Sequence, residues 1–218
     1  MRKLFFFVLL LSLFVVPLAQ CQNTEPAPSD VVALPAPVTS GGMAVSEALA
    51  TRRSVRTFTE ARLTLPEISQ LLWAAQGVTD AKGHRTAPSA MARYYLTVYV
   101  ASSNGLFQYI PDGHKLKKLS ADDLRAKLST QQAVTSAPSV FIIAGDYDRA
   151  TQSLNAEFGA RAVDLEAGHA TQNLLLQATA LKLVGVPAGG INPADVAKAV
   201  SLPDSSRPIY LVPIGHAR

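Results

Sequence analysis

The stretch EAGHATQNLLLQATALKLVGVPAGGI, residues 166–191, decides the fold. Small and apolar residues recur on several sides of a helix that we predict over 161–183, with Gly185 ending it. A helix that is apolar over so much of its circumference is buried on more than one side. We therefore expect this helix at the centre of the molecule, with a sheet packed against it.

Helix and strand patterns alternate on both sides of this helix. Thr64-Leu65-Pro66-Glu67 is a capping box, which predicts a helix that Gly77 closes. The strands are indicated by alternating apolar residues, and a hairpin by the turn residues at 111–113. The other predicted elements are helices over 46–53 and 122–131, a short helix from Asn192, strands over 94–101, 139–144 and 209–214, and the hairpin over 106–119. This alternation indicates a single α+β domain.

The N-terminus has the layout of a secretory signal peptide. Arg2 and Lys3 precede an apolar run over 4–16, which is shorter than the roughly 20 residues that a membrane-spanning helix needs. We assign residues 1–20 to the signal peptide, 21–44 to a Pro-rich linker and 45–218 to the folded domain. Cys21, the single cysteine, is either lipidated and forms a membrane-anchored lipoprotein, or follows an ordinary cleavage site. In both cases we expect an exported protein, in the periplasm or the envelope of a bacterium.

The composition suits a globular protein and argues against two kinds of site. Hydrophobic residues make up 48% and charged residues 17%, with a formal net charge of +4. Acidic residues are interleaved with the basic ones, so no continuous phosphate-tracking stripe forms and a nucleic-acid partner is not expected. The four histidines are dispersed, with no carboxylate or cysteine at ligand spacing, so no metal site is expected.

The first candidate site lies where the helix predicted over 46–53 ends, and it consists of Arg52, Arg53, Ser54 and Arg56. Like charges this close repel one another unless an anion or acidic groups compensate them. Arginine suits a phosphate because its planar fork donates paired hydrogen bonds. A solvated basic helix end is the competing interpretation, since cations are stable near helix C-termini.

Two turns of small residues form the other candidate segments. Pro88-Ser89-Ala90 precedes a strand, has little bulk to keep a flat ligand away, and offers the hydroxyl of Ser89. Pro187-Ala188-Gly189-Gly190 follows the long helix, and its two glycines bare the backbone amides. A plain loop and an ordinary turn with positive φ are the competing interpretations. Ser89 has no neighbouring base in the sequence, so a hydrolase triad is not expected.

Together these segments resemble the FMN-dependent nitroreductase family, in particular its SagB-type dehydrogenase branch. The matching stretches are RRSVRTF at 52–58, APSAMARYYLTVYV at 87–100, the stretch at 166–191 and IYLVPIGHAR at 209–218. Each stretch alone is unspecific, but the four follow the family order and cover essentially the whole domain. The resemblance implies a nitroreductase-like FMN fold, with an antiparallel-rich sheet on a long central helix. It also implies a homodimer whose two FMN sites are each built from both chains.

The resemblance implies roles for particular residues. Those that would hold the phosphate, the ribityl chain and the pyrimidine edge of FMN are Arg52, Arg53, Ser54 and Arg56. Those that would line the cofactor from the partner chain are Pro88, Ser89 and Ala90. Those that would lie along the isoalloxazine ring near N5 are Pro187, Ala188, Gly189 and Gly190. Arg218 resembles a basic residue that reaches the phosphate in relatives.

This chain departs from the common family pattern at two places. Many relatives have an acidic residue where this chain has Gly189. Many also have an asparagine in the Pro-Ser turn, where this chain has Ala90, Met91 and Ala92, as the SagB-type branch tends to have. The substrates of the classical nitroreductases are therefore not transferred to this chain.

The expected activity is that of an exported FMN-dependent oxidoreductase. In the family, a donor reduces the flavin by hydride transfer at N5 and leaves before the acceptor binds, which gives ping-pong kinetics. The protein needs no catalytic acid or base, because the cofactor carries the chemistry. The substrate is a small molecule or a peptide, since SagB-type enzymes dehydrogenate azoline rings in modified peptides. The alternatives are an envelope protein that binds flavin without turnover, and a tethered domain whose arginines meet an acidic partner.

Overall fold

The computed structural model describes residues 30–218, so the predicted signal peptide (1–20) and Cys21 lie outside the described residues. Within this range the strands form one sheet, and neighbouring strands are antiparallel. Their spatial order is β1 (Val31–Ala33), β4 (Lys115–Ser120), β3 (Gly105–Ile110), β2 (Leu96–Ser102), β5 (Ser139–Asp146), β7 (Ser206–His216) and β6 (Leu183–Gly185). The prediction of an α+β fold with an antiparallel-rich sheet is confirmed.

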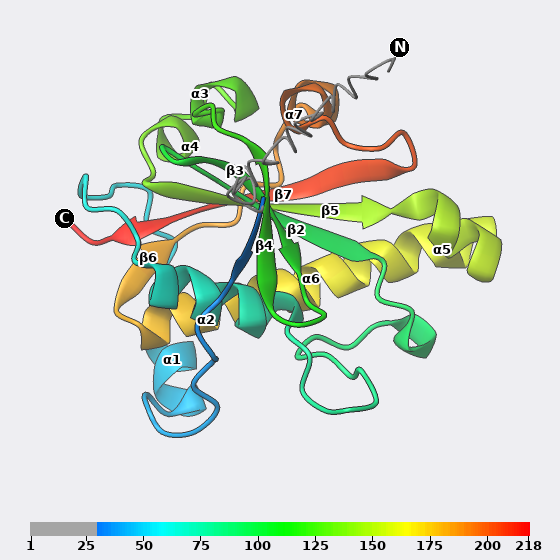
Figure 1. Cartoon of the computed structure of the whole chain (residues 1–218), viewed down its shortest axis with the longest axis horizontal. Helices are drawn as coiled ribbons and strands as arrows, with labels where there is room; N and C mark the ends of the chain where they lie inside the picture. Colours follow the sequence, from blue (N-terminus) through cyan, green and yellow to red (C-terminus); the bar gives the residue numbers. More distant parts are fainter. Residues whose placement is uncertain (1–29) are drawn as a thin grey trace, which may run out of the picture.

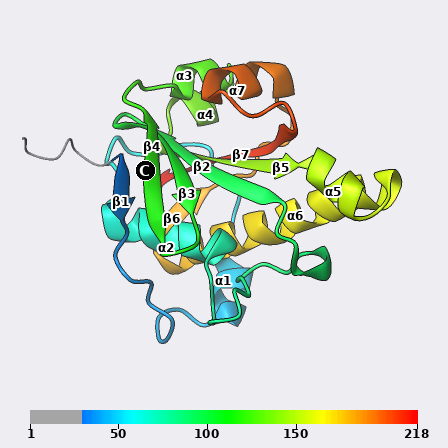
Figure 2. The same ribbon diagram turned by 45° about the vertical axis from the view of Figure 1, so that its right-hand side comes forward.

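Helices cover both faces of the sheet (Figure 1). The helices below the sheet in this view are α1 (Val45–Thr51), α2 (Leu65–Gln76) and α6 (Ala156–Ala180). Those above it are α3 (Arg125–Leu128), α4 (Gln132–Thr135) and α7 (Pro193–Val200), and α5 (Tyr147–Ser153) follows the end of β5. Figure 2 shows the same two layers after a rotation of 45°. Within residues 30–218 no helix combines the length and the apolar character that crossing a membrane requires.

The interior strand β5 is buried on both faces, because its side chains alternate between the two faces of the sheet and helices cover both. Phe141 and Ile143 pack into the core beneath the sheet, together with Leu174 of α6. Ile142 packs into the second core, together with Val196 of α7. All five side chains are fully buried. The long helix α6 therefore packs against the sheet as predicted, but it lies in the layer beneath the sheet and has an exposed side rather than occupying the centre of the molecule.

The long helix α6 begins and ends earlier than the predicted range, 161–183. Asn155 caps its first turn by accepting a hydrogen bond from Phe158 N at 2.8 Å. The helix ends before Lys182, whose φ is 61°. Leu183, predicted as the last helical residue, instead begins the edge strand β6. The apolar pattern does not separate these two structures, since a short buried strand and a buried helical turn are both continuously apolar.

The helix predicted over 122–131 is too long: only the short α3 lies within this range, and a separate short helix, α4, begins at Gln132. Asp123 accepts hydrogen bonds from Arg125 N at 3.1 Å and from Arg125 Nε at 2.9 Å, just where α3 begins. Ser129 then adopts an extended backbone, and its Oγ accepts from Gln131 N at 3.1 Å. Such local bonds from side chains to the backbone compete with a continuous helix.

The described part of the predicted linker, 21–44, packs onto the domain. Val31–Ala33 pairs with β4 as the edge strand β1. Farther along, Val38 N donates to Gln70 Oε1 at 2.8 Å, and Gln70 Nε2 donates to Val38 O at 3.0 Å. The folded unit therefore begins before residue 45, because a very short apolar run is enough to add an edge strand.

His114 fastens this N-terminal segment through a chain of hydrogen bonds. Its Nε2 lies 2.7 Å from Ser69 Oγ, and this hydroxyl donates to Pro35 O at 2.6 Å. The hydroxyl therefore accepts from Nε2–H, and His114 Nδ1 accepts from the Tyr109 hydroxyl at 2.8 Å. Burial lowers the pKa of His114, so the neutral ring is the form that the fold favours.

We expect the free energy of unfolding to decrease as the pH falls below about 6.5. Because the pKa of His114 is lower in the folded than in the unfolded chain, unfolding takes up a proton at mildly acidic pH. Urea unfolding at about pH 7.5 and about pH 5.5 measures this loss. The variant His114→Asn has no titratable side chain at this position and should lose the part of the pH dependence that His114 contributes. Equal pH dependence in the parent and the variant would assign it to other groups.

Candidate functional site at the β6 edge

Two of the predicted site segments meet at the edge strand β6. Ser54 forms a parallel bridge with Gly185, and Val55 N donates to Gly185 O at 3.1 Å. Farther along, Phe58 pairs with Ala217 beyond the end of β7. The arginine segment, residues 52–58, therefore runs along the free edge of the sheet. It lies beside the start of the glycine turn, residues 187–190, which follows β6.

The three arginines differ in what holds them. Arg53 Nη1 donates to Ala50 O at 2.9 Å and to Arg52 O at 2.8 Å, at the C-terminal end of α1. The interpretation as a helix-end cation therefore applies to Arg53. Within residues 30–218, the guanidinium groups of Arg52 and Arg56 are in none of the ion pairs. Two guanidinium groups at this edge are thus available to an anion.

The glycine turn presents bare backbone to open space. Ala188 pairs with Leu211 through bonds of 2.8 and 3.0 Å, which fixes the base of the turn. A Cβ atom added at Gly190 would meet nothing within 4 Å, and one added at Gly189 would meet the Tyr210 ring at 3.3 Å. Neither glycine has a positive φ, so the backbone conformation does not require glycine. In the described part of the chain their amide groups donate no hydrogen bond and can serve a ligand.

Arg218 joins the same edge of the sheet. Its Nε donates to Phe58 O at 3.1 Å, beside the bridge between Phe58 and Ala217. Thr59 N also donates to His216 O at 3.0 Å, which fastens the two segments together. A further guanidinium group therefore lies next to the arginine segment.

The third predicted segment, Pro88-Ser89-Ala90, is held elsewhere in the molecule. Ser89 Oγ donates to Glu166 Oε2 at 2.6 Å, in the N-terminal half of α6, whereas β6 follows the C-terminal end of that helix. From Glu166 to its last residue, the helix rises about 20 Å, at about 1.5 Å per residue. One chain therefore brings together only part of the predicted site, an arrangement that a site shared between two chains would produce.

Glu166 was not expected at the site, and it proves to be a centre of polar contacts. It is 1% exposed and accepts hydrogen bonds from Ser89, from Tyr95 N at 3.1 Å and from Gln76 Nε2 at 3.2 Å. Gln76 Oε1 accepts from Arg85 Nη1 at 2.8 Å. Burial lowers the pKa of Arg85, and the negative charge of Glu166 opposes that shift. In the sequence, Glu166 could have been noticed as a carboxylate on the apolar side of a predicted helix. Buried carboxylates are rare unless they are paired, so its position indicates polar partners.

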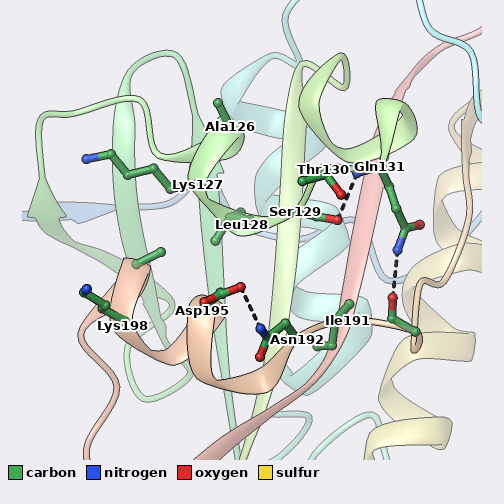
Figure 3. A pocket seen from close by; sticks show the side chains of 12 residues that line it. Ala126, Lys127, Leu128, Ser129, Thr130, Gln131, Ile191, Asn192, Asp195 and Lys198 are labelled. Carbon is green, nitrogen blue, oxygen red and sulfur yellow. Dashed lines mark hydrogen bonds between the residues drawn. The ribbon is translucent and has the colours of Figure 1, made fainter.

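A cavity of about 500 Å³ lies beside the glycine turn, between α7 and the segment that joins α3 to α4 (Figure 3). Gly190 forms one wall, and its carbonyl accepts from Gln131 Nε2 at 2.8 Å. Lys127 and Lys198 lie at the opposite end in Figure 3. The volume is within the range of roughly 300–1,000 Å³ for small-molecule sites. Among residues 30–218, no group of three or more His, Cys, Asp or Glu side chains is placed to hold a metal ion.

Comparison with known proteins identifies the family. A model of the nitroreductase family matches residues 49–216. The chain belongs to the nitroreductase family. A protein of Methanocaldococcus jannaschii that carries the name nitroreductase is 35% identical over 181 residues, which are 78% of this chain and 90% of that protein. The family match thus includes the arginine segment, the turn at 88–90 and the glycine turn.

Solved structures share the fold of this nitroreductase-family chain. A structure from Ralstonia eutropha, described as a nitroreductase, has a TM-score of 0.82 and 33% identity, and covers 87% of this chain and 90% of its own. A chain of the E. coli microcin synthetase McbBCD complex, solved with truncated pro-MccB17 bound, has a TM-score of 0.67 and 19% identity. That match covers 94% of this chain and 84% of the other, and it concerns the fold alone. The predicted nitroreductase-like fold is confirmed.

Proposed function

We propose that this nitroreductase-family chain is an FMN-dependent oxidoreductase whose flavin lies at the β6 edge of the sheet. The bridge between Ser54 and Gly185 carries the proposal, because it brings the arginine segment beside the glycine turn. Family membership supports the oxidoreductase class and the cofactor.

The residues at this edge fit the chemistry of FMN. The phosphate is an anion, and the guanidinium groups of Arg52 and Arg56 can donate paired, charge-assisted hydrogen bonds to it. Ser54 is exposed beside them and adds a hydroxyl. The isoalloxazine ring is flat and needs a close approach to backbone, which Gly189 and Gly190 permit because neither carries a side chain and a Cβ atom at Gly190 would meet nothing within 4 Å. The guanidinium groups of Arg53 and Arg218 add further positive charge beside the proposed phosphate position.

The protein contributes binding, orientation and electrostatics. When bound, FMN supplies hydride transfer at its N5 atom. The arginines hold positive charge beside the polar edge of the ring, which favours negative charge there. The amides of Gly189 and Gly190, which donate no hydrogen bond in the described part of the chain, would be free to donate to the ring. The pairing of Ala188 with Leu211 keeps this turn in place without using either glycine amide.

A homodimer with shared flavin sites is part of the proposal. The segment Pro88-Ser89-Ala90 lies away from the β6 edge of its own chain, so it would line the flavin of the partner. The α6 helix also leaves two large apolar side chains exposed, Phe158 at 49% and Leu165 at 50%. They are seven positions apart, about two helical turns, which places both on one side of the helix. This exposed apolar side supports burial of α6 against a second copy of the chain.

The SagB-type branch is a finer part of the proposal. Ala90, Met91 and Ala92, where many relatives have an asparagine in this turn, support it. The fold shared with the microcin synthetase chain is compatible with a peptide substrate, and the cavity beside Gly190 with a small molecule. Export stays a prediction made from residues 1–20.

Purified protein tests the function directly. We expect it to be yellow, with an absorption band at about 450 nm from oxidised flavin. A suitable reductant should bleach this band under anaerobic conditions, and an acceptor added afterwards should restore it. Colourless protein that also ignores added FMN would contradict the proposal. Yellow protein that no reductant bleaches would instead support a flavin-binding protein without turnover.

A further inference from the structure

The turn that follows Ser89 has a strained backbone. Met91, Ala92 and Tyr94 have φ values of 52°, 53° and 52°, in the left-handed region that residues with a side chain rarely adopt. Such strain persists only where the surrounding structure enforces it, and it gathers at functional sites. The strained turn, residues 89–94, therefore needs an identifiable restraint.

Hydrogen bonds to Ser89 and Glu166 supply that restraint. Ser89 Oγ accepts from Tyr94 N at 2.8 Å, which closes the turn, and donates to Glu166 at 2.6 Å. Tyr95 N donates to the same carboxylate oxygen at 3.1 Å. Arg149 Nη2 adds a bond to Tyr94 O on the outer side. The carboxylate thus holds both ends of the strained turn against α6.

The other oxygen of Glu166 ties the turn to α2. Gln76 Nε2 donates to it at 3.2 Å, and Gln76 Oε1 accepts from Arg85 Nη1 at 2.8 Å. The guanidinium of Arg85 lies 4.6 Å from the centre of the Tyr94 ring, so Arg85 in turn contacts a residue of the strained turn. A buried carboxylate is costly unless its oxygens are hydrogen-bonded, and here both oxygens are.

These contacts argue against the role that the sequence suggested for Ser89, in which its hydroxyl would serve the cofactor directly. Its only proton is donated to Glu166, and its oxygen already accepts from Tyr94 N, so the hydroxyl cannot also donate to a flavin. We propose that Glu166 is a positioning residue, which holds the strained turn in the shape that lines the flavin of the partner chain. The inference rests on the proposed function. It assigns Ser89 to the support of the turn and leaves the contact with FMN to its backbone and small side chains.

Paired substitutions separate an acceptor role of Glu166 from a packing role. Glu166→Gln keeps an oxygen for Ser89 and Tyr95, whereas Glu166→Met keeps the bulk and removes both acceptors. If Glu166 positions the turn, Glu166→Met weakens FMN binding about tenfold and Glu166→Gln by no more than about threefold. If the position needed only packing, the apolar Met would be tolerated better than Gln. FMN affinity is measured by titrating the apoprotein while following flavin fluorescence.

A double-mutant cycle and a matched control complete the test. Ser89→Ala should weaken FMN binding about as much as Glu166→Met. The double variant should bind FMN no more weakly than Glu166→Met alone, because both substitutions remove the same hydrogen bond between Ser89 and Glu166. Leu174→Ala is the control: it empties part of the same helix interface and lowers the melting temperature, yet leaves FMN affinity unchanged. Hydrogen exchange at Tyr94 and Tyr95 should accelerate in Glu166→Met and not in Leu174→Ala.

The outcomes distinguish this inference from the proposed function. If the parent protein binds FMN and both Glu166→Met and Ser89→Ala bind it as tightly as the parent, the positioning role is overturned. The proposed function is then left intact. Additive losses in the double variant also overturn it, since the two residues would then act separately. Parent protein that binds no FMN overturns the proposed function, and the positioning role with it.

Discussion

Replacing Arg52 and Arg56 together with alanine is expected to lower the affinity for FMN about a thousandfold. Each guanidinium has no ion-pair partner within residues 30–218, and a charge-assisted hydrogen bond contributes about 2 kcal/mol. Two such contacts give about 4 kcal/mol, or about three powers of ten in the dissociation constant. The melting temperature of the apoprotein should hardly change, because the substitutions break no ion pair or hydrogen bond in the described part of the chain.

The matched control for this variant is Arg62→Ala. Arg62 is exposed and donates to Asn104 Oδ1 at 3.1 Å, so its loss removes one positive charge without touching the β6 edge. FMN titrations of the parent, the double variant and the control should show a loss only in the double variant. Parent-like affinity in the double variant would mean that the arginine segment does not bind the phosphate.

Replacing Leu165 with aspartate is expected to convert a dimer into monomers and to remove FMN at the same time. The side chain is 50% exposed on α6, and a charge there could not be buried against a second copy without a large desolvation cost. Because Pro88-Ser89-Ala90 would line the flavin of the partner, separated chains keep only half of each site. Light scattering coupled to size-exclusion chromatography reports the mass, and absorbance at the flavin band reports the cofactor.

Leu119→Asp is the control for the dimer prediction. Leu119 is also a half-exposed leucine, at 40%, but it lies on β4, near the opposite edge of the sheet from β6. This variant should keep both the mass and the flavin content of the parent. A Leu165→Asp monomer that binds FMN as tightly as the parent would show that one chain builds the whole site.

Elements with local signals could be predicted from the sequence. The capping box between Thr64 and Glu67 forms as expected, with Thr64 N donating to Glu67 Oε2 at 2.6 Å. Asn192 likewise caps α7 by accepting from Ala194 N at 3.1 Å. These signals act within one helical turn, so tertiary structure need not decide them.

Features that depend on distant partners could not be predicted in the same way. Nothing near Leu183 shows that it will pair with β7, and only that pairing distinguishes strand β6 from a last helical turn. The hydrogen bonds of the arginines also depend on tertiary structure: Arg53 donates to two carbonyl oxygens at the end of α1, whereas the Arg56 side chain donates to none within residues 30–218. The partner of Ser89 lies 77 residues along the chain, on another element.

The order of the strands has a consequence for how the molecule would sit if it were held by its N-terminal segment. The chain enters the described fold at β1, one outer edge of the sheet, while the arginine segment and the glycine turn flank β6, the other outer edge. Six inter-strand steps of about 4.8 Å separate these edges, a span of about 29 Å. The β1 edge would therefore lie nearest the surface to which the protein is attached. The β6 edge would point away from that surface, where reductants and acceptors could reach it by diffusion.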